Sequence, residues 1–448
     1  MKLKDLRIYI PSIALLAVWL AVYLVRSIPI IEFHPVGTNT HLHILLFILT
    51  GAIAGFFGGS FALINKKTTA PEYKKRTINR RATIIAFIGV SSSILALLKY
   101  QSLTEAMPTT IAEITELRLE RGRDLHMEKG SNIFGVIANI TSGFSILSYL
   151  YLKYFESQLS HRKRRLLLAS FISGASSSLL SGGRWTIAIA ILSILFSRFS
   201  KSSILKNCIP NPKKNKKRTR NRILKTVIAT STVTIVIYVF FSIFLHRAGD
   251  SSDGSHILVD YVSTNLDGTT VSSQSMEFAS RNDLTASLFF ICSMTQYYVG
   301  HSYYQLDILL NAPTPDNAPY YLAYQLYPYA MLLNKVGANI ISISQIQDEI
   351  VNPGFYFTLL GSCYLDFGYW GALLCISFGM FFGSFFWAKW TLSNRFEYQY
   401  LSFLTITVIT ISPILSAINT AVFPSLISII PLLLFLTPRT FKQKELFR

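Results

Sequence analysis

The 448-residue chain is 51% hydrophobic and only 15% charged, with a mean hydropathy of +0.40. Because a soluble domain carries about a quarter charged residues, this composition excludes an ordinary soluble enzyme, and the high apolar content excludes a disordered chain. The net charge of +19 would indicate nucleic-acid binding in a soluble protein, but the positions of the charges point elsewhere.

Apolar segments long enough to cross a hydrocarbon core of ~30 Å recur along the chain. We expect ten spanning helices, at residues 8–25, 42–64, 82–98, 133–152, 166–180, 185–199, 226–245, 369–388, 398–416 and 420–437. Residues 355–368 are interpreted as a re-entrant piece before the eighth span. The sequence therefore predicts an all-α polytopic membrane protein, in one bundle rather than the three domains that length alone suggests.

This plan divides the chain into three parts. Residues 1–245 hold the first seven spans, 246–354 form a large outside loop that is partly helical, and 355–448 hold the re-entrant piece, the last three spans and a basic tail. Within the second span, Gly51, Gly55 and Gly59 are spaced for close packing between helices.

Positive charge alternates from loop to loop in this plan. With the N-terminus inside, 32 of the 42 Lys and Arg residues fall in inside segments, and 18 of the 23 Asp and Glu residues fall outside. Since short cytoplasmic loops retain Lys and Arg during insertion, both termini are predicted to be cytoplasmic. The basic run at 213–222 then serves as a topology anchor near anionic lipid, and we expect no nucleic-acid partner.

The loop 246–354 is too long for a structureless connection, so we expect it to be functional. Its apolar stretches at 284–299 and 319–333 are expected to lie on the outer face, because counting either as a span would break the charge alternation. The loop is rich in tyrosine, at positions Tyr297, Tyr298, Tyr303, Tyr304, Tyr320, Tyr321, Tyr324, Tyr327 and Tyr329. Tyrosine suits stacking on sugar rings and also suits the membrane interface, so only a subset is expected to contact substrate.

Common catalytic signatures are missing from the sequence. It has no phosphate loop, dinucleotide fingerprint, zinc-protease motif, Cys-x-x-Cys pair or serine-hydrolase elbow, and no Asp-x-Asp pair to hold the metal of a nucleotide-sugar. We therefore expect chemistry on a substrate already in the membrane, with no metal, nucleotide or other cofactor.

The most informative constellation is Ser181-Gly182-Gly183-Arg184, between two helices of ~15 residues each. A helix of that length spans ~22 Å, less than the hydrocarbon core, so the turn is expected below the outer surface. The glycines let the backbone approach a ligand, and the helix at 185–199 directs the positive end of its dipole there. An intramembrane Arg184 beside a helix N-terminus predicts an anion site; the alternative is an arginine that snorkels to the headgroups.

Two further places, Arg281 with Asp283 and the segment around Asp366, are candidates for a second wall of that site. Arg281 and Asp283 precede the apolar stretch at 284, where Ser280 or Asp283 is equally suited to cap a helix. Asp366 lies among glycines and aromatic residues at the outer mouth, where a carboxylate either acts as a general base or pairs with an arginine. His301 is a weaker base candidate, because most single histidines are simply hydrogen-bonded.

These features together resemble the Wzy-type O-antigen polymerases, also called oligosaccharide repeat unit polymerases. The matching features are the ten-span plan, the Gly182-Gly183-Arg184 turn, the large loop with Arg281-Asn282-Asp283, and the Gly361 to Gly371 segment around Asp366. The resemblance implies a glycosyltransferase of the bacterial inner membrane with its active site facing the periplasm. It would move a growing glycan from one undecaprenyl pyrophosphate carrier onto a new carrier-linked repeat unit.

The resemblance also implies roles for the candidate residues. Pyrophosphate would be bound by Arg184, Arg281, Gly182 and Gly183, and the catalytic base would be Asp283, Asp366 or His301. Besides the undecaprenyl-pyrophosphate-linked oligosaccharides and membrane lipid, a chain-length regulator and a flippase of the same pathway are candidate partners.

Two other functions stay open at the level of sequence. An O-antigen ligase would use the same donor with a lipid A-core acceptor, and a lipid-linked oligosaccharide flippase would be a transporter rather than an enzyme. A flippase should carry charges along its spans, whereas here the intramembrane charge lies only at the outer mouth, which favours a transferase.

Overall fold

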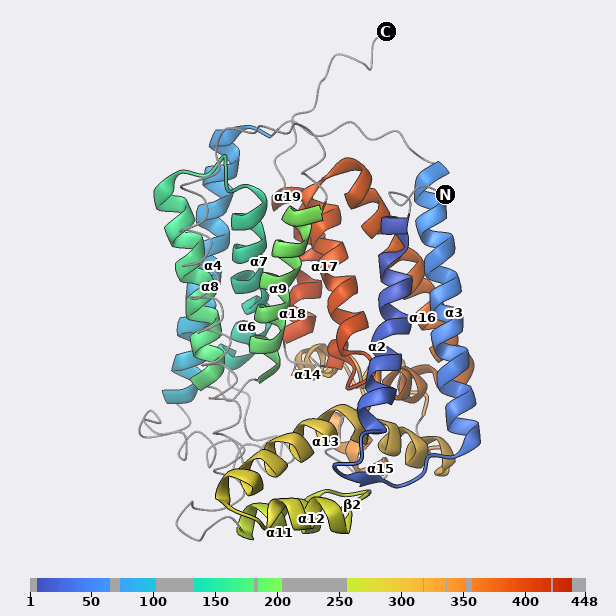
Figure 1. The fold of residues 1–448 in the computed structure, drawn as a ribbon. Coiled ribbons are helices and arrows are strands. Elements are labelled where there is room, and N and C mark those ends of the chain that lie inside the picture. Colours follow the sequence, from blue (N-terminus) through green and yellow to red (C-terminus); the bar gives the residue numbers. More distant parts are fainter. Residues whose placement is uncertain are drawn as a thin grey trace, which may run out of the picture.

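The computed structural model describes residues 6–64, 73–101, 133–180, 184–203, 256–316, 318–335, 337–350, 357–419 and 422–436. These residues form a bundle of long helices with a layer of further helices across one end (Figure 1). We call the end of the bundle where residues 256–350 lie the covered end. Nine of the ten predicted spans fall on described segments of the bundle, and the tenth, 226–245, falls outside the described residues.

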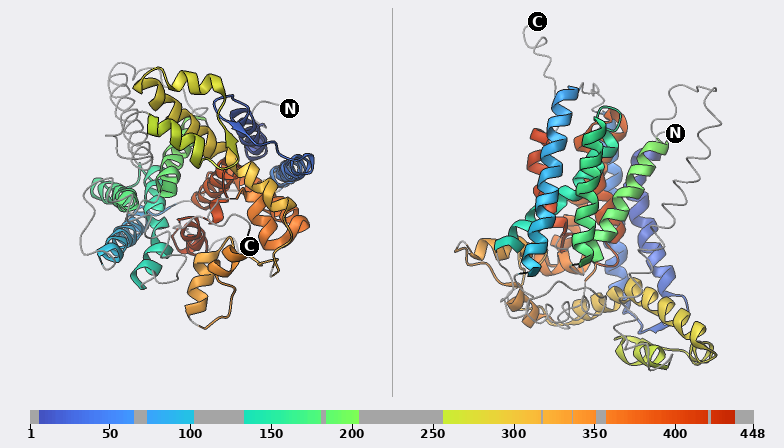
Figure 2. Two further views of the ribbon diagram at one scale, coloured as in Figure 1. Left: turned by 90° about the horizontal axis from the view of Figure 1, so that it is seen from below. Right: turned by 90° about the vertical axis from the view of Figure 1, so that its left-hand side faces the viewer.

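The helices of the bundle run side by side and nearly parallel in Figure 1. They are α2 (Ile10–Arg26, preceded by the 3-10 turn η1, Arg7–Tyr9), α3 (Thr38–Ile64), α4 (Lys75–Gln101), α6 (Ile133–Thr141), α7 (Gly143–Tyr154), α8 (His161–Leu180), α9 (Arg184–Ser203), α16 (Leu359–Ser393) and α17 (Phe396–Ile411). Viewed along the bundle, α17 and the segment that follows it lie near the centre (Figure 2).

Four of the described helices are long and apolar enough to cross a membrane: Arg7–Arg26, Thr38–Ile64, Lys75–Leu98 and Leu359–Ser393. Trp185–Phe199 and Val422–Leu432 are apolar but shorter. The helical, membrane-type fold expected from the sequence agrees with these helices, while the count of ten spans stays a prediction.

Two expected spans are interrupted in the structure. Residues 133–152 divide at Ser142 into α6 and α7, where Gly143 lies against Ser425. The expected span 420–437 is broken into α18 (Val422–Ser428), a 3-10 turn η4 (Ile430–Leu432) and α19 (Leu433–Leu436). The break falls at Pro431, which has no N–H for the helical ladder and clashes with the preceding turn.

The re-entrant piece expected at 355–368 is helical from Leu359 onward and continues into the following span. Helix α16 bends at Gly368, whose φ of 67° is left-handed and is readily adopted only by glycine. The bend falls next to the boundary at residue 369 that the sequence predicts, and it turns the first part of α16 away from the axis of the rest.

The layer at the covered end consists of α11 (His256–Asn265), β2 (Thr269–Thr270), α12 (Ser273–Ala279), α13 (Asp283–Asn311), α14 (Tyr327–Lys335) and α15 (Ile343–Glu349). Strand β2 pairs antiparallel with β1 (Glu32–Phe33), which lies between α2 and α3. Helix α13 runs crosswise to the bundle in both side views (Figures 1 and 2). The stretch 284–299 therefore lies across the end of the bundle instead of crossing with the long helices.

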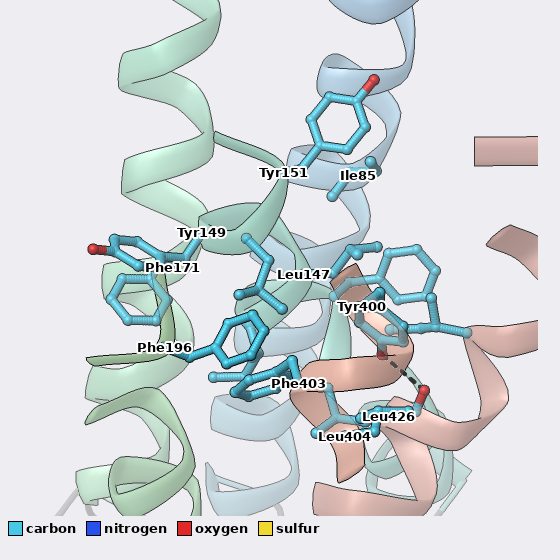
Figure 3. Packing of buried hydrophobic residues seen from close by; sticks show 14 of the residues in the cluster. Ile85, Leu147, Tyr149, Tyr151, Phe171, Phe196, Tyr400, Phe403, Leu404 and Leu426 are labelled. Atoms are coloured by element: carbon cyan, nitrogen blue, oxygen red, sulfur yellow. Dashed lines mark hydrogen bonds between the residues drawn. The ribbon is translucent and has the colours of Figure 1, made fainter. Parts of the chain in front are cut away.

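The main core joins helices that are distant in sequence. Figure 3 shows Tyr149 of α7 on Phe171 of α8, with ring centroids 4.6 Å apart, and Phe196 of α9 on Phe403 of α17, 5.5 Å apart. The Tyr400 hydroxyl donates to the Leu426 carbonyl oxygen over 2.8 Å, which fixes α18 beside α17 (Figure 3).

Helices α3 and α16 approach each other through glycine. A β-carbon at Gly51 would lie 2.8 Å from Ile376, and one at Gly55 2.5 Å from Ser12 and 2.8 Å from Ser384. The packing role predicted for the glycine spacing is thereby confirmed, and it extends to α2 as well as α16.

Candidate functional site at the covered end

Arg184 is the first residue of α9, and this end of α9 lies at the covered end of the bundle (Figure 1). Its neighbour Trp185 packs against the core and Ile189 is fully buried, so the first turns of the helix are fixed in place. Gly182 and Gly183 lie outside the described residues. The first N–H groups of a helix have no partner within it and form the positive end of its dipole, so the start of α9 offers backbone donors at the covered end.

Arg281 and Asp283 lie on the surface of the layer. The Arg281 guanidinium is 3.5 Å from the carboxylate of Glu277 one turn earlier, and both side chains are largely exposed, so this pair contributes little to stability. The N-cap of α13 is Asn282, whose side chain accepts from the Thr285 N–H, while the Thr285 hydroxyl accepts from the Asn282 N–H. The cap expected at Ser280 or Asp283 is thus wrong. Asp283 is exposed in the first turn of α13, where its negative charge interacts favourably with the positive end of the helix dipole.

His301 is buried in the middle of α13. Its Nδ1 donates to the Tyr297 carbonyl oxygen over 3.0 Å, and its ring stacks on that of Tyr297 at a centroid distance of 4.8 Å. Burial lowers the pKa of His301 to about 4, so the imidazole is neutral at pH 7. The structure therefore places His301 as a packed, hydrogen-bonded side chain without exposure to solvent.

Asp366 is fully buried in α16, before the bend at Gly368. One carboxylate oxygen accepts from the Tyr324 N–H and the other from the Gln325 N–H, each over 3.0 Å. The Asp366 carbonyl oxygen also accepts from the Tyr321 N–H over 2.9 Å. In the described part of the chain no cation forms an ion pair with Asp366, so its partners are backbone donors instead of the arginine considered from the sequence.

The segment bound by Asp366 has an unusual backbone. Residues 320–326, which we call the Asp366 turn, include Tyr321 with φ of 48° and Leu322 with φ of 75°. Left-handed φ values are uncommon outside glycine, cost free energy, and persist only where the surroundings enforce them. The hydrogen bonds from the turn to Asp366 supply that enforcement.

Gln325 is a linking residue that the sequence analysis missed. Its Nε2 donates to the Cys363 sulfur over 3.4 Å, and its Oε1 accepts from the Ser416 hydroxyl over 3.3 Å. It therefore joins the Asp366 turn to α16 and to the residues after α17. The sequence held a signal for this role, because Gln325 is the one side-chain amide in the apolar stretch 319–333. A buried amide needs hydrogen-bond partners.

Arg26 is a second missed residue, at the C-terminal end of α2. Its guanidinium donates to the carbonyl oxygens of Gly300, over 3.2 Å, and His34, over 2.6 Å, and it lies 4.8 Å from the centre of the Phe33 ring. This cation fastens α13 to the connection between α2 and α3. The available signal was an arginine directly after an apolar span, because a partly buried guanidinium needs hydrogen-bond acceptors.

The site thus separates into a buried part and an exposed part. Asp366 and His301 are inside the junction between the layer and the bundle, whereas Arg281 and Asp283 are on the layer's surface. In the described ranges no group of three or more His, Cys, Asp or Glu side chains is placed to hold a metal ion. Comparisons with protein-family models, with curated proteins and with solved structures find no match.

Proposed function

We propose that this chain is an oligosaccharide repeat unit polymerase, a metal-independent glycosyltransferase of the bacterial inner membrane. Its active site would lie at the covered end, facing the periplasm. The proposal is carried by the position of Arg184, at the start of a 20-residue helix that begins at the same end of the bundle as the layer 256–350.

The chemistry of the donor explains why that position matters. A glycan leaving undecaprenyl pyrophosphate develops negative charge on the diphosphate, at the depth of the outer headgroups. Arginine grips phosphate oxygens in a bidentate manner, and the N–H groups of a helix N-terminus bind anions. Both groups stabilise the leaving group more as its charge grows, which is the condition for accelerating the reaction.

The acceptor requires a sugar hydroxyl and a nearby base. Asp283 is the exposed member of the three base candidates, whereas both oxygens of Asp366 already accept backbone N–H groups. His301 is buried and neutral at pH 7. These observations favour Asp283 as the base, with the exposed Arg281 beside it as a second cation.

The test is replacement of Arg184 in cells that depend on this chain for surface polysaccharide. Arg184→Ala should lower polymerisation about 100-fold or more, the usual effect of removing one group that stabilises developing charge. Lipopolysaccharide gels should then show core bearing single repeat units in place of a ladder. Arg184→Lys should also be impaired, because an ammonium cannot reproduce the bidentate grip.

The matched control is Arg162→Ala, which removes an exposed arginine near the start of α8, at the opposite end of the bundle. It should leave the ladder intact. A full ladder in Arg184→Ala would exclude Arg184 from the mechanism. On deletion of the whole gene, accumulated carrier-linked polymer would indicate a ligase, and single lipid-linked units confined to the cytoplasmic leaflet would indicate a flippase.

A further inference from the structure

Burial separates one tyrosine from the rest of the tyrosine-rich segment. Of the nine tyrosines between residues 297 and 329, all within the described chain, Tyr321 is the one with an exposed side chain, 76% accessible. Tyr297, Tyr303, Tyr320 and Tyr324 are buried and the other four are half-buried. A tyrosine that stacks on a large ligand must have an exposed ring, and the ring of Tyr321 is exposed.

The backbone that presents this ring is strained and held in place. Tyr321 and Leu322 are consecutive left-handed residues, a conformation that persists only where the surroundings enforce it and that gathers at ligand-binding sites. The Tyr320 N–H donates to the Leu365 carbonyl oxygen over 3.1 Å and the Tyr321 N–H to that of Asp366 over 2.9 Å. Tyr324 and Gln325 then close the turn on the Asp366 carboxylate, so the ring projects from a fixed base.

The exposed apolar side chains of α16 indicate where Tyr321 lies relative to the bilayer. Beyond the bend, four large apolar side chains spaced four residues apart are exposed along one side of this helix: Trp370 (76%), Leu374 (59%), Phe378 (62%) and Phe382 (50%). Such a stripe on a helix long and apolar enough to span is expected to face lipid. Asp366, to which Tyr321 is bound, precedes Trp370 by four residues. Tyr321 is therefore hydrogen-bonded to α16 four residues before the stripe begins, on the N-terminal side of the bend at Gly368.

We propose that Tyr321 is a stacking platform for a pyranose ring of a lipid-linked glycan. This inference rests on the proposed function and adds the residue that receives the sugars. The carrier lipid of such a glycan lies in the bilayer, so its sugars begin at the membrane surface, near the end of the stripe that Trp370 marks. The flat ring of tyrosine, with its polar tip, suits the apolar face of a sugar. A tyrosine that only anchors the protein in the headgroups needs no left-handed backbone or buried carboxylate beneath it.

The experiment measures glycan binding by the full-length protein in lipid nanodiscs. The probe is the soluble oligosaccharide that mild acid releases from the carrier-linked glycan of the same cells, followed by saturation-transfer NMR and titration. Tyr321→Ala should weaken binding about tenfold, the effect expected of one aromatic stacking contact. Tyr321→Phe keeps the ring and should bind within about twofold of the wild type.

Phe378→Ala is the control for loss of an exposed aromatic ring elsewhere on the stripe, and it should bind the oligosaccharide with the affinity of the wild type. Unchanged affinity in Tyr321→Ala would overturn the platform, and a changed melting temperature with unchanged affinity would identify a membrane anchor. Equal losses of oligosaccharide affinity in Tyr321→Ala and Tyr321→Phe would also overturn stacking. If the oligosaccharide binds through Tyr321 while Arg184→Ala still makes a full ladder, the platform stands and the proposed role of Arg184 fails.

Discussion

The contacts of Asp366 decide between two roles for this carboxylate, a general base in the reaction and a hydrogen-bond acceptor that holds the Asp366 turn. Each oxygen of Asp366 accepts one backbone N–H from the Asp366 turn. In Asp366→Asn, one oxygen is replaced by an NH₂ group that faces another donor. A buried N–H is then left unsatisfied, which costs about 1–3 kcal/mol of stability. We expect a lower melting temperature for the purified variant.

Asp283→Asn is the matched control, because this carboxylate is exposed in the first turn of α13. Its melting temperature should stay within a degree or two of the wild type, since surface changes are usually within about 0.5 kcal/mol. Loss of polymerisation in Asp366→Asn at an unchanged melting temperature would contradict the structural role and identify Asp366 as the base.

Sequence reasoning finds such residues more readily than it finds their partners. Asp366 and His301 stand out in the chain as polar groups in apolar surroundings, and both are buried in the structure. The donors to Asp366 are backbone groups of Tyr324 and Gln325, about forty positions earlier. Backbone N–H groups carry no residue-type signal, so no sequence pattern could distinguish this arrangement from an ion pair with arginine.

At the scale of an element, the approach of α3 to α16 depends on Gly58. A β-carbon there would lie 2.0 Å from the Phe381 carbonyl oxygen, and backbone cannot move aside as a flexible side chain can. Gly58→Ala should therefore separate the two helices and cost about 1–3 kcal/mol, as overpacking does. The measurement is thermal or detergent-induced unfolding of the purified protein.

Gly379, on α16 itself, provides the control. No atom lies within 4 Å of the position that its β-carbon would occupy, so Gly379→Ala should be neutral or should stabilise the helix by up to about 1 kcal/mol. Equal destabilisation by the two substitutions would show that the close contact at Gly58 is not what holds the helices together.

Helix breaks were harder to predict than helices. The apolar runs locate α2, α3, α4 and α9 well, because hydropathy averages over many residues. The end of the chain reads as one apolar run, yet Pro431 divides it, and hydropathy is insensitive to a missing N–H. Gly368 marks the bend in α16, but a glycine in an apolar helix is as often a packing residue, as Gly55 is.

At the scale of the whole molecule, the two ends of the bundle differ in charge. The basic starts of α4 (Lys75, Arg76, Arg80, Arg81) and α8 (Arg162, Lys163, Arg164, Arg165) lie at the end opposite the layer 256–350 (Figure 1). Since basic loops stay in the cytoplasm, this separation supports an orientation in which the covered end faces the periplasm. The alternation of charge in the sequence and the direction of the helices thus lead to the same expectation.

The native cysteines can test this orientation without any insertion. Cys292 is exposed on α13 in the layer, whereas Cys208 falls in the basic segment 198–225 of the sequence. A membrane-impermeant maleimide added to spheroplasts should modify Cys292 and leave Cys208 unmodified until the membrane is opened, as mass spectrometry of the peptides would show. Cys363 is buried and should react only after denaturation. Modification of Cys208 before Cys292 would reverse the orientation and place Arg184 on the cytoplasmic side, where no lipid-linked glycan is polymerised by the proposed reaction.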